Sequence, residues 1–236
     1  MQKRYLKNEN MLSHEENLSL REKKVLVVGC GGLGGHIVEQ LARLGVGLIT
    51  AVDADTFDET NLNRQLFSHS MNIGESKAFA AKKHVAIINP DIKLNALQVF
   101  LDESNAGEIT KGFDVICDAL DSVVSRFILQ KYAAINHTPM VHGAIAGWYG
   151  QVTTIFPNDN TLNYIYHTSQ NKGIEQELGN PSFTPALVAS IEVSEVLKIL
   201  TGKGRLLRNR VLIINTLEQE YEILELGAYP TKDCTL

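Results

Sequence analysis

Short apolar runs alternate with amphipathic segments through the first part of the chain. The run Lys23–Gly29 (KKVLVVG) is rich in β-branched residues and ends in glycine, a pattern typical of a strand buried on both faces. Over Gly32–Leu44 the apolar residues recur at helical spacing, which predicts an amphipathic helix, and Gly47–Asp53 is a second buried strand. The alternation continues with a helix at Glu75–Ile88, ended by Asn89-Pro90, a strand at Phe113–Asp118, a helix at Ser122–Asn136 and a strand at Pro139–Ala144.

The pattern changes after Trp148, where strand-like runs follow one another with short connections. A polar stretch over Pro157–Phe183 is long for a compact domain, and loops of this length are often functional. The predicted elements here are strands at Gln151–Phe156, Arg210–Asn215 and Glu220–Leu226, the last two forming a hairpin, and a helix at Pro185–Leu200.

The order of elements predicts an α/β fold. We expect a Rossmann-like, doubly wound and mostly parallel sheet, with antiparallel strands added in its C-terminal part and ligand chemistry at the carboxyl ends of the parallel strands. An N-terminal arm over residues 1–22, with a short helix around His14–Glu22, would precede a single folded domain over 23–228 and a C-terminal tail over 229–236.

The composition is that of an ordinary globular protein. Of the 236 residues, 44% are hydrophobic and 21% charged, and the net charge of −5 argues against a nucleic-acid-binding protein, which usually carries a basic face. No apolar run is long enough to span a membrane and the polar N-terminus lacks a signal-peptide core, so we expect a cytoplasmic protein. The cysteines Cys30, Cys117 and Cys234 form no CxxC pair, and we expect neither disulfides nor a zinc site from them.

A glycine-rich loop directly follows the first predicted strand. Gly29, Gly31, Gly32 and Gly34 fit the pattern G-x-G-x-x-G, which lets backbone N–H groups approach a phosphate at a helix N-terminus. Asp53 ends the second predicted strand, where an acidic residue accepts hydrogen bonds from ribose hydroxyls. These features alone fit an NAD-dependent dehydrogenase equally well.

Charged residues that follow distinguish the two nucleotide chemistries. The segments containing Asp55, Asn61, Arg64 and Lys77 supply cations that a dehydrogenase does not need. An enzyme that attacks the α-phosphorus of ATP needs them, because negative charge builds on the departing pyrophosphate. Asp121, just after the predicted strand Phe113–Asp118, could hold Mg2+, or could instead cap the helix that follows.

The succession of motifs along the chain resembles that of the MoeB/ThiF/HesA family, prokaryotic relatives of ubiquitin-activating enzymes. The resemblance covers Lys23–Leu226 and rests on GCGGLGG, TAVDADTFDETNLNRQ, GESKA, INPDI, CDALDSV, HGAIAGWYGQV and the closing TP-x9-E-x2-KIL helix. It implies an ATP-dependent adenylyltransferase that activates the C-terminal glycine carboxylate of a small ubiquitin-like sulfur-carrier protein, MoaD- or ThiS-like and ending in Gly-Gly, to an acyl-adenylate. The motifs do not distinguish molybdenum or tungsten cofactor, thiamin and other sulfur-transfer pathways.

The resemblance also implies roles for individual residues and a homodimer. The glycine loop would line the ATP site, with Asp53 on the ribose and Asp55 close by. Asn61 and Arg64 would contact the phosphates with Lys77 beside them, and Asp121 would bind Mg2+. The predicted catalytic residues are Arg64, Lys77, Asp121 and Lys7.

The N-terminal arm departs from the family pattern. Relatives carry an R-Y-x-R-Q motif whose second arginine reaches the active site of the partner subunit, whereas this chain reads Arg4–Asn8 (RYLKN). Lys7 keeps the charge without the planar guanidinium fork. We expect Lys7 to act across a dimer interface.

Two further departures concern metal and thiol chemistry. The two CxxC pairs of a family zinc site are replaced by Asn163–His167 (NYIYH) and Asn215–Gln219 (NTLEQ), so we expect no zinc, with Tyr164, Ile165 and Tyr166 packed against the late strands instead. The segment Gly179–Pro185 has no cysteine, so activation would stop at the adenylate.

Weaker signals and two other functions remain open. His142 is expected to pack in the core, and Trp148 and Tyr149 either pack or help to form a groove for the carrier's tail, crossed by the Pro157–Phe183 stretch. Asp121-Ser122-Val123 also resembles the zinc-free tRNA threonylcarbamoyladenosine dehydratases. A non-catalytic scaffold that binds nucleotide or carrier is the third possibility.

Overall fold

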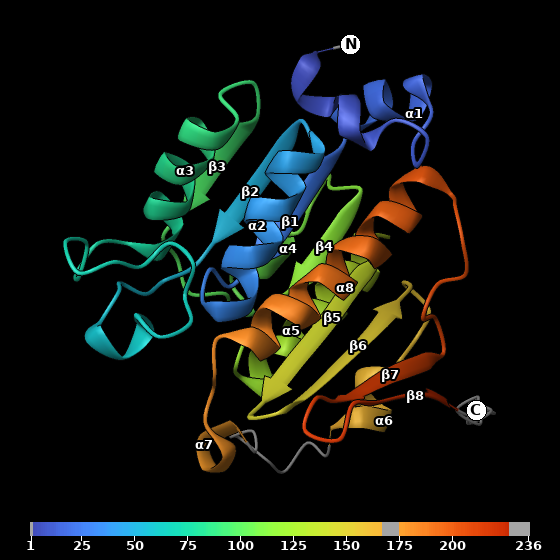
Figure 1. The fold of residues 1–236 in the computed structure, drawn as a ribbon. Helices are drawn as coiled ribbons and strands as arrows, with labels where there is room; N and C mark the ends of the chain where they lie inside the picture. The colour runs from blue at the N-terminus through green and yellow to red at the C-terminus, as the bar shows by residue number, and fades with distance from the viewer. Residues whose placement is uncertain (1, 167–174, 227–236) are drawn as a thin grey trace.

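One mixed sheet forms the centre of the molecule. The computed structural model describes residues 2–166 and 175–226, in which eight strands pair in the order β3-β2-β1-β4-β5-β6-β7-β8 (Figure 1). The strands are β1 Lys24–Val28, β2 Leu48–Val52, β3 Lys93–Leu97, β4 Val115–Asp118, β5 Met140–Ala146, β6 Tyr149–Ile155, β7 Arg210–Asn215 and β8 Glu220–Glu225. The predicted tail 229–236, Cys234, His167 and part of the Pro157–Phe183 stretch lie outside the described residues.

The sheet confirms the predicted fold class. Strands β1 to β5 pair in parallel, and β6, β7 and β8 each pair antiparallel with the strand before them. Four of the five residues of β1 and all four of β4 are buried, because helices cover both faces of this part of the sheet.

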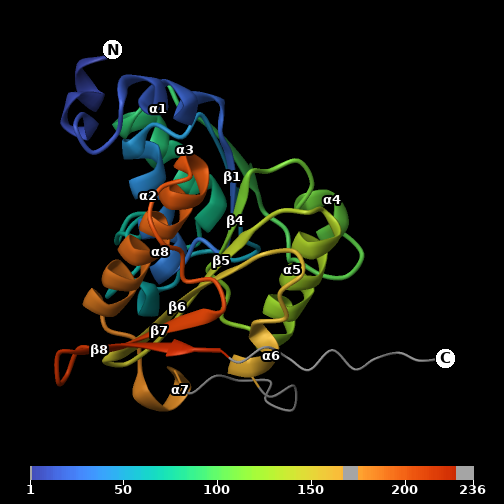
Figure 2. The same ribbon diagram turned by 90° about the vertical axis from the view of Figure 1, so that its right-hand side faces the viewer.

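The helices form a layer on each side of the sheet. Helices α2, α3 and α8 lie on one face and α4 and α5 on the other (Figure 2). The principal helices are α2 Gly32–Leu44, α3 Lys77–Ile88, α5 Val123–Ile135 and α8 Phe183–Thr201, and the short ones are α1 His14–Ser19, α4 Ala106–Ile109, α6 Leu162–Ile165 and α7 Glu175–Leu178, with 3-10 turns η1 Lys3–Asn8, η2 Leu20–Glu22 and η3 Glu59–Asn61. Helix α8, at 19 residues, is the longest element described, and within the described residues no helix has the length and apolarity needed to cross a bilayer.

Side chains and glycines set the helix ends as the sequence indicates. The hydroxyls of Ser76 and Ser122 accept hydrogen bonds from backbone N–H groups in the first turns of α3 and α5. Helix α2 ends at Gly45, whose φ of 96° is in the left-handed region that favours glycine. Ser122 is therefore the N-cap of α5, and the alternative in which Asp121 caps this helix is wrong.

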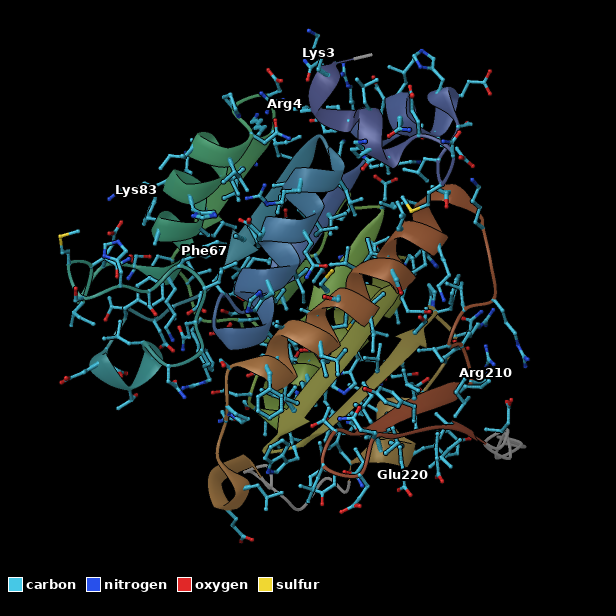
Figure 3. The ribbon with its side chains drawn as sticks, in the orientation of Figure 1. Lys3, Arg4, Phe67, Lys83, Arg210 and Glu220 are labelled. Atoms are coloured by element: carbon cyan, nitrogen blue, oxygen red, sulfur yellow. The ribbon has the colours of Figure 1, made fainter. Side chains whose placement is uncertain are left out.

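The N-terminal elements pack at the amino ends of the parallel strands. Tyr5 is buried, and its hydroxyl accepts a hydrogen bond from Asn89 Nδ2 at 2.8 Å. Arg4 donates to the same asparagine, and Figure 3 shows this side chain beside the end of α3 that lies away from Phe67. The arm is thus fixed at the amino ends of the parallel strands, away from their carboxyl ends.

Candidate active site

A cavity of about 570 Å³ opens at the carboxyl ends of the parallel strands. The glycine loop, the loops after β2 and β4 and the start of α3 line it. The predicted residues found in its lining are Gly29, Gly31, Gly32, Asp53, Asp55, Asn61, Arg64, Lys77 and Asp121. Gly34 and Lys7 are not among the lining residues of their own chain.

The glycines of the loop serve two different needs. A Cβ at Gly29 would lie 2.4 Å from the Ala119 carbonyl oxygen, and one at Gly34 would lie 1.8 Å from the Gly29 carbonyl oxygen, so backbone packing requires both glycines. A Cβ at Gly31 or Gly32 would meet only side-chain atoms, at 3.4 to 3.9 Å. These two positions are open toward the cavity, as the approach of a phosphate requires.

Asp53 fixes the glycine loop against the end of β2. Its two carboxylate oxygens accept hydrogen bonds from the backbone N–H groups of Cys30 at 2.7 Å and Asp55 at 2.8 Å. Burial raises the pKa of Asp53, although these two hydrogen bonds and the charge of Lys77 oppose the rise. Each carboxylate oxygen keeps a further lone pair for a ribose hydroxyl.

Lys77 brings a buried positive charge to the start of α3. The residue is only 8% exposed, and its Nζ lies 3.0 Å from Asp55 Oδ2. The backbone N–H of Lys77 also donates to the Asp55 carbonyl oxygen at 3.0 Å, which fastens the helix start to the loop after β2. A phosphate in the cavity could therefore meet an ammonium group and a helix N-terminus together.

The segment around η3 carries the second cation. Asn61 is buried and forms a reciprocal capping box with Asp58. Arg64 Nη1 donates to the Thr60 carbonyl oxygen at 3.0 Å and to Asn63 Oδ1 at 2.9 Å. Gln65, also in the lining, has a buried Oε1 without a hydrogen-bond partner among the described residues.

Asp121 fits the donor set that Mg2+ prefers. Its side chain is exposed, lines the cavity, and makes no hydrogen bond or ion pair with the described residues. Mg2+ is usually held by one or two carboxylates together with substrate phosphates and water. Asp121 can supply such a carboxylate to the cavity that Arg64 and Lys77 also line.

A group of buried polar side chains lies behind the loop after β4, and the sequence did not predict that they contact one another. His142 was expected to pack in the core, and it is fully buried, but its Nδ1 lies 2.8 Å from Asp118 Oδ2. Its Nε2 faces the hydroxyl of Tyr166 at 3.1 Å, and the same hydroxyl accepts from Arg126 at 2.7 Å. Arg126 lines the cavity, and sequence reasoning missed it.

Helix α8 places a carboxyl group without a hydrogen-bond partner among the described residues against the middle of β5. Glu192 is fully buried, and neither of its oxygens has a hydrogen-bond partner among the described residues. Gly143 makes room for it, since a Cβ there would lie 2.4 Å from Glu192 Cδ. Burial raises the pKa of Glu192 well above its ordinary range, which favours the neutral acid.

The predicted packing of the NYIYH segment is only partly correct. Tyr166 does pack inward and reaches one of the late strands, β6, through a hydrogen bond from Gln151 at 2.8 Å. It also contacts α5 and β5, and its hydroxyl makes polar rather than apolar contacts there. Tyr164 is 37% exposed.

Trp148 packs against Phe183 with ring centroids 4.9 Å apart, and both remain partly exposed.

Neither described cysteine is poised for thiol chemistry. Cys30 and Cys117 are both buried at strand ends, as expected. Burial raises the pKa of both thiols well above the ordinary value, which disfavours the reactive thiolate.

Comparison with known proteins places the chain among adenylating enzymes. The family model described as the ThiF family matches residues 4–236. The SAMP-activating enzyme E1 of Haloferax volcanii is 31% identical over 218 residues, which cover 91% of this chain and 80% of that protein. The sulfur carrier protein adenylyltransferase of Thermus thermophilus is 30% identical, covering 89% and 81% respectively. Two Mycobacterium tuberculosis relatives named probable adenylyltransferase/sulfurtransferase MoeZ are longer, and the chain spans 56% of their length.

Two solved structures share the fold. The crystal structure of E. coli MccB with ATP superposes with a TM-score of 0.83, covering 98% of this chain and 73% of MccB at 19% identity. E. coli tRNA N6-threonylcarbamoyladenosine dehydratase, TcdA, superposes with a TM-score of 0.71 at 25% identity, covering 84% of this chain and 94% of TcdA. The relatives' names support the prediction of an enzyme.

Proposed function

Because the chain belongs to the ThiF family, we propose that it adenylates the C-terminal carboxylate of a small ubiquitin-like sulfur-carrier protein at the expense of ATP. The observation that carries the proposal is the set of charges around one cavity: Lys77 and Arg64 beside the glycine loop, and Asp121 in the lining after β4. The names of the Haloferax and Thermus relatives support the choice of substrate class.

The proposed reaction forms one bond and breaks another at the α-phosphorus of ATP. A carboxylate oxygen of the carrier's terminal glycine attacks the α-phosphorus, and the bond to the bridging oxygen breaks, so that pyrophosphate leaves with the electron pair. Arg64 and Lys77 hold the phosphates and stabilise the charge that develops on them. Asp53 would orient the ribose by accepting hydrogen bonds from its hydroxyls. The carrier leaves this step as an acyl-adenylate.

Magnesium has a suitable position in this scheme. Asp121 would hold Mg2+, which would neutralise charge on the phosphate oxygens. The buried, high-pKa thiols of Cys30 and Cys117 argue against a thioester on these two residues, so the adenylate would be the product released to a sulfur-transfer partner.

A related dehydratase activity is the second candidate. The TcdA likeness, which covers 94% of that protein at 25% identity, and the Asp121-Ser122-Val123 motif favour it. Such an enzyme would use the same ATP site with tRNA as the acceptor. The net charge of −5 favours a protein carrier over tRNA.

Pyrophosphate exchange into ATP tests both candidates. The full chain would be incubated with labelled pyrophosphate, ATP and Mg2+, and with MoaD-like carrier, ThiS-like carrier, tRNA or no acceptor. Exchange only with a carrier supports the proposal, and a carrier lacking its last glycine is the matched control. tRNA-dependent ATP turnover without carrier-dependent exchange would favour the dehydratase. ATP binding without turnover in any mixture would favour a scaffold.

A further inference from the structure

Five residues form a closed ring of hydrogen bonds behind the cavity: three lie in β4, α5 and β5, one follows β4 and one follows α6. Tyr166, at the end of α6, accepts from Arg126 Nη1 at 2.7 Å. Arg126 Nε and Nη2 donate to the Leu120 carbonyl oxygen at 3.0 and 2.6 Å. The Leu120 N–H donates to Asp118 Oδ1 at 3.1 Å. Asp118 Oδ2 lies 2.8 Å from His142 Nδ1, and His142 Nε2 faces the Tyr166 hydroxyl at 3.1 Å, which closes the ring.

The surroundings of His142 indicate how the hydrogen bonds of the ring run, although its Nε2 also lies 3.3 Å from Gln151 Nε2. His142 Nδ1 faces the Asp118 carboxylate, which accepts, so this nitrogen carries a proton. Burial lowers the pKa of this histidine, which favours its neutral form. Its Nε2 is then an acceptor for the Tyr166 hydroxyl. Gln151 Nε2 donates to the same hydroxyl from β6 at 2.8 Å and supports it from outside the ring.

The ring holds the backbone of Leu120 from both sides. The Asp118 carboxylate accepts a hydrogen bond from the Leu120 N–H, and the Arg126 guanidinium donates to the Leu120 carbonyl oxygen. The backbone is therefore held in place directly before Asp121. Asp118, His142 and Arg126 are all at least nine-tenths buried, where charge-assisted hydrogen bonds are strong. Tyr166, the residue directly after α6, is the only member of the ring from this part of the chain.

We propose that Tyr166 is a positioning residue that sets the Mg2+ dependence of the site by fixing the Leu120–Asp121 segment through Arg126 and His142. The inference rests on the proposed function for its metal, but the geometry of the ring does not. The inference connects the residue after α6 with the position of the Asp121 carboxylate in the cavity.

The test substitution is Tyr166→Phe, which removes only the hydroxyl. The matched control is Tyr132→Phe, which removes a tyrosine hydroxyl from α5, where it contacts Glu103 away from the cavity. Isothermal titration would measure ATP binding in EDTA and at several Mg2+ concentrations. Hydrogen exchange would follow the Leu120 amide in both variants without any substrate.

We expect Tyr166→Phe to raise the Mg2+ concentration that half-saturates the effect on ATP binding by roughly tenfold. This is the change expected when one hydrogen bond to a charged group, here Arg126, is lost. ATP affinity in EDTA should stay within about twofold of the native value, and the Leu120 amide should exchange faster. In an Asp121→Asn background the same substitution should have no further effect on Mg2+ dependence. Tyr132→Phe should change none of these.

Several results would overturn the inference. They are an unchanged Mg2+ dependence, an equal loss of ATP affinity with and without Mg2+, or unaltered exchange at Leu120. If Tyr166→Phe does not fold, His142→Asn opens the ring at another point, since its amide can reach Asp118 but not Tyr166, and it carries the same expected shift. Because binding and exchange need no carrier, a chain that adenylates nothing would refute the proposed function and leave this test intact.

Discussion

Glu192 and Glu195 are buried carboxyl groups of one helix with opposite surroundings. Glu195 accepts hydrogen bonds from the Thr154 hydroxyl at 2.6 Å and the Leu207 N–H at 2.8 Å, and it pairs with Lys198. Glu192, one turn earlier, has no partner among the described residues. The two side chains should therefore differ in how they respond to substitution and to pH.

Glu192 should make the protein less stable as the pH rises. Its folded-state pKa is well above the ordinary value of 4.5, so above that value the folded protein keeps a proton that the unfolded chain releases. Linkage then lowers the free energy of unfolding as the pH rises. Glu192→Gln removes this dependence, and between pH 5 and pH 8 it should gain about 1.4 kcal/mol or more relative to the native chain, the value of one pKa unit.

Urea denaturation at the two pH values measures this difference. Glu195→Gln is the control: it should destabilise the protein at both pH values, because it weakens the pair with Lys198 and the hydrogen bond from the Leu207 N–H. Parallel pH profiles of the native chain and Glu192→Gln would contradict the assignment of a neutral Glu192.

Lys77 should matter for chemistry far more than for folding. Lys77→Met removes the buried ammonium from the cavity and should lower kcat/KM for carrier-dependent pyrophosphate exchange by roughly 10²- to 10³-fold. Lys83→Met is the matched control on the same helix, where Lys83 is exposed and pairs with Glu75. This control should alter activity by less than about twofold. Equal losses in the two variants would reject a specific role for Lys77.

Adjacent glycines in α2 allow a test at the scale of the element. A Cβ at Gly34 would overlap the Gly29 carbonyl oxygen, whereas one at Gly35 would meet Leu66 at 3.6 Å, an ordinary contact. Gly34→Ala should force α2 away from β1, cost about 3 kcal/mol, and weaken ATP binding although Gly34 does not line the cavity. Gly35→Ala should stay within about 1 kcal/mol of the native stability, because alanine favours the helix. Thermal unfolding with and without ATP would measure both.

The elements that the sequence predicted are those with strong periodicity. The continuous apolar run of β1 and the amphipathic pattern of α2 marked both elements to within a residue or two. Strand β3 (KLNAL) was missed because it lies at the edge of the sheet and carries polar residues, and α4 is too short, at four residues, to show a helical period.

In the site, too, only residues that belong to a local sequence pattern could be predicted. Arg64, Lys77 and Asp121 were recognisable because each belongs to a local motif. The ring through Tyr166 was not, since its contact with Arg126 joins residues 40 positions apart and no local pattern marks it. Orphaned groups such as Glu192 are visible only when the packing around them is known.

At the scale of the whole molecule, the N-terminal arm and the cavity lie at opposite ends of the parallel strands. Turn η1 carries Lys7, and Arg4 of the same turn donates a hydrogen bond to Asn89 in the loop before β3. The cavity opens at the carboxyl ends of the strands, and Figure 1 shows the N-terminal elements at the opposite ends of these strands. Lys7 is exposed and cannot serve the cavity of its own chain in this arrangement. A catalytic role for Lys7 therefore requires a second copy.

Mixing two inactive variants tests that requirement. If Lys7 acts on the partner's cavity, a mixed dimer of Lys7→Ala and Asp121→Asn contains one intact site: the cavity of the Lys7→Ala chain keeps Asp121 and receives the native Lys7 of the other. Random re-association of equal amounts should recover about a quarter of the native exchange rate, because half of the dimers are mixed and each has one working site. If Lys7 acted within its own chain, both sites of the mixed dimer would be defective and mixing would recover nothing. If Lys7→Ala alone kept the native rate, Lys7 would have no catalytic role in either subunit.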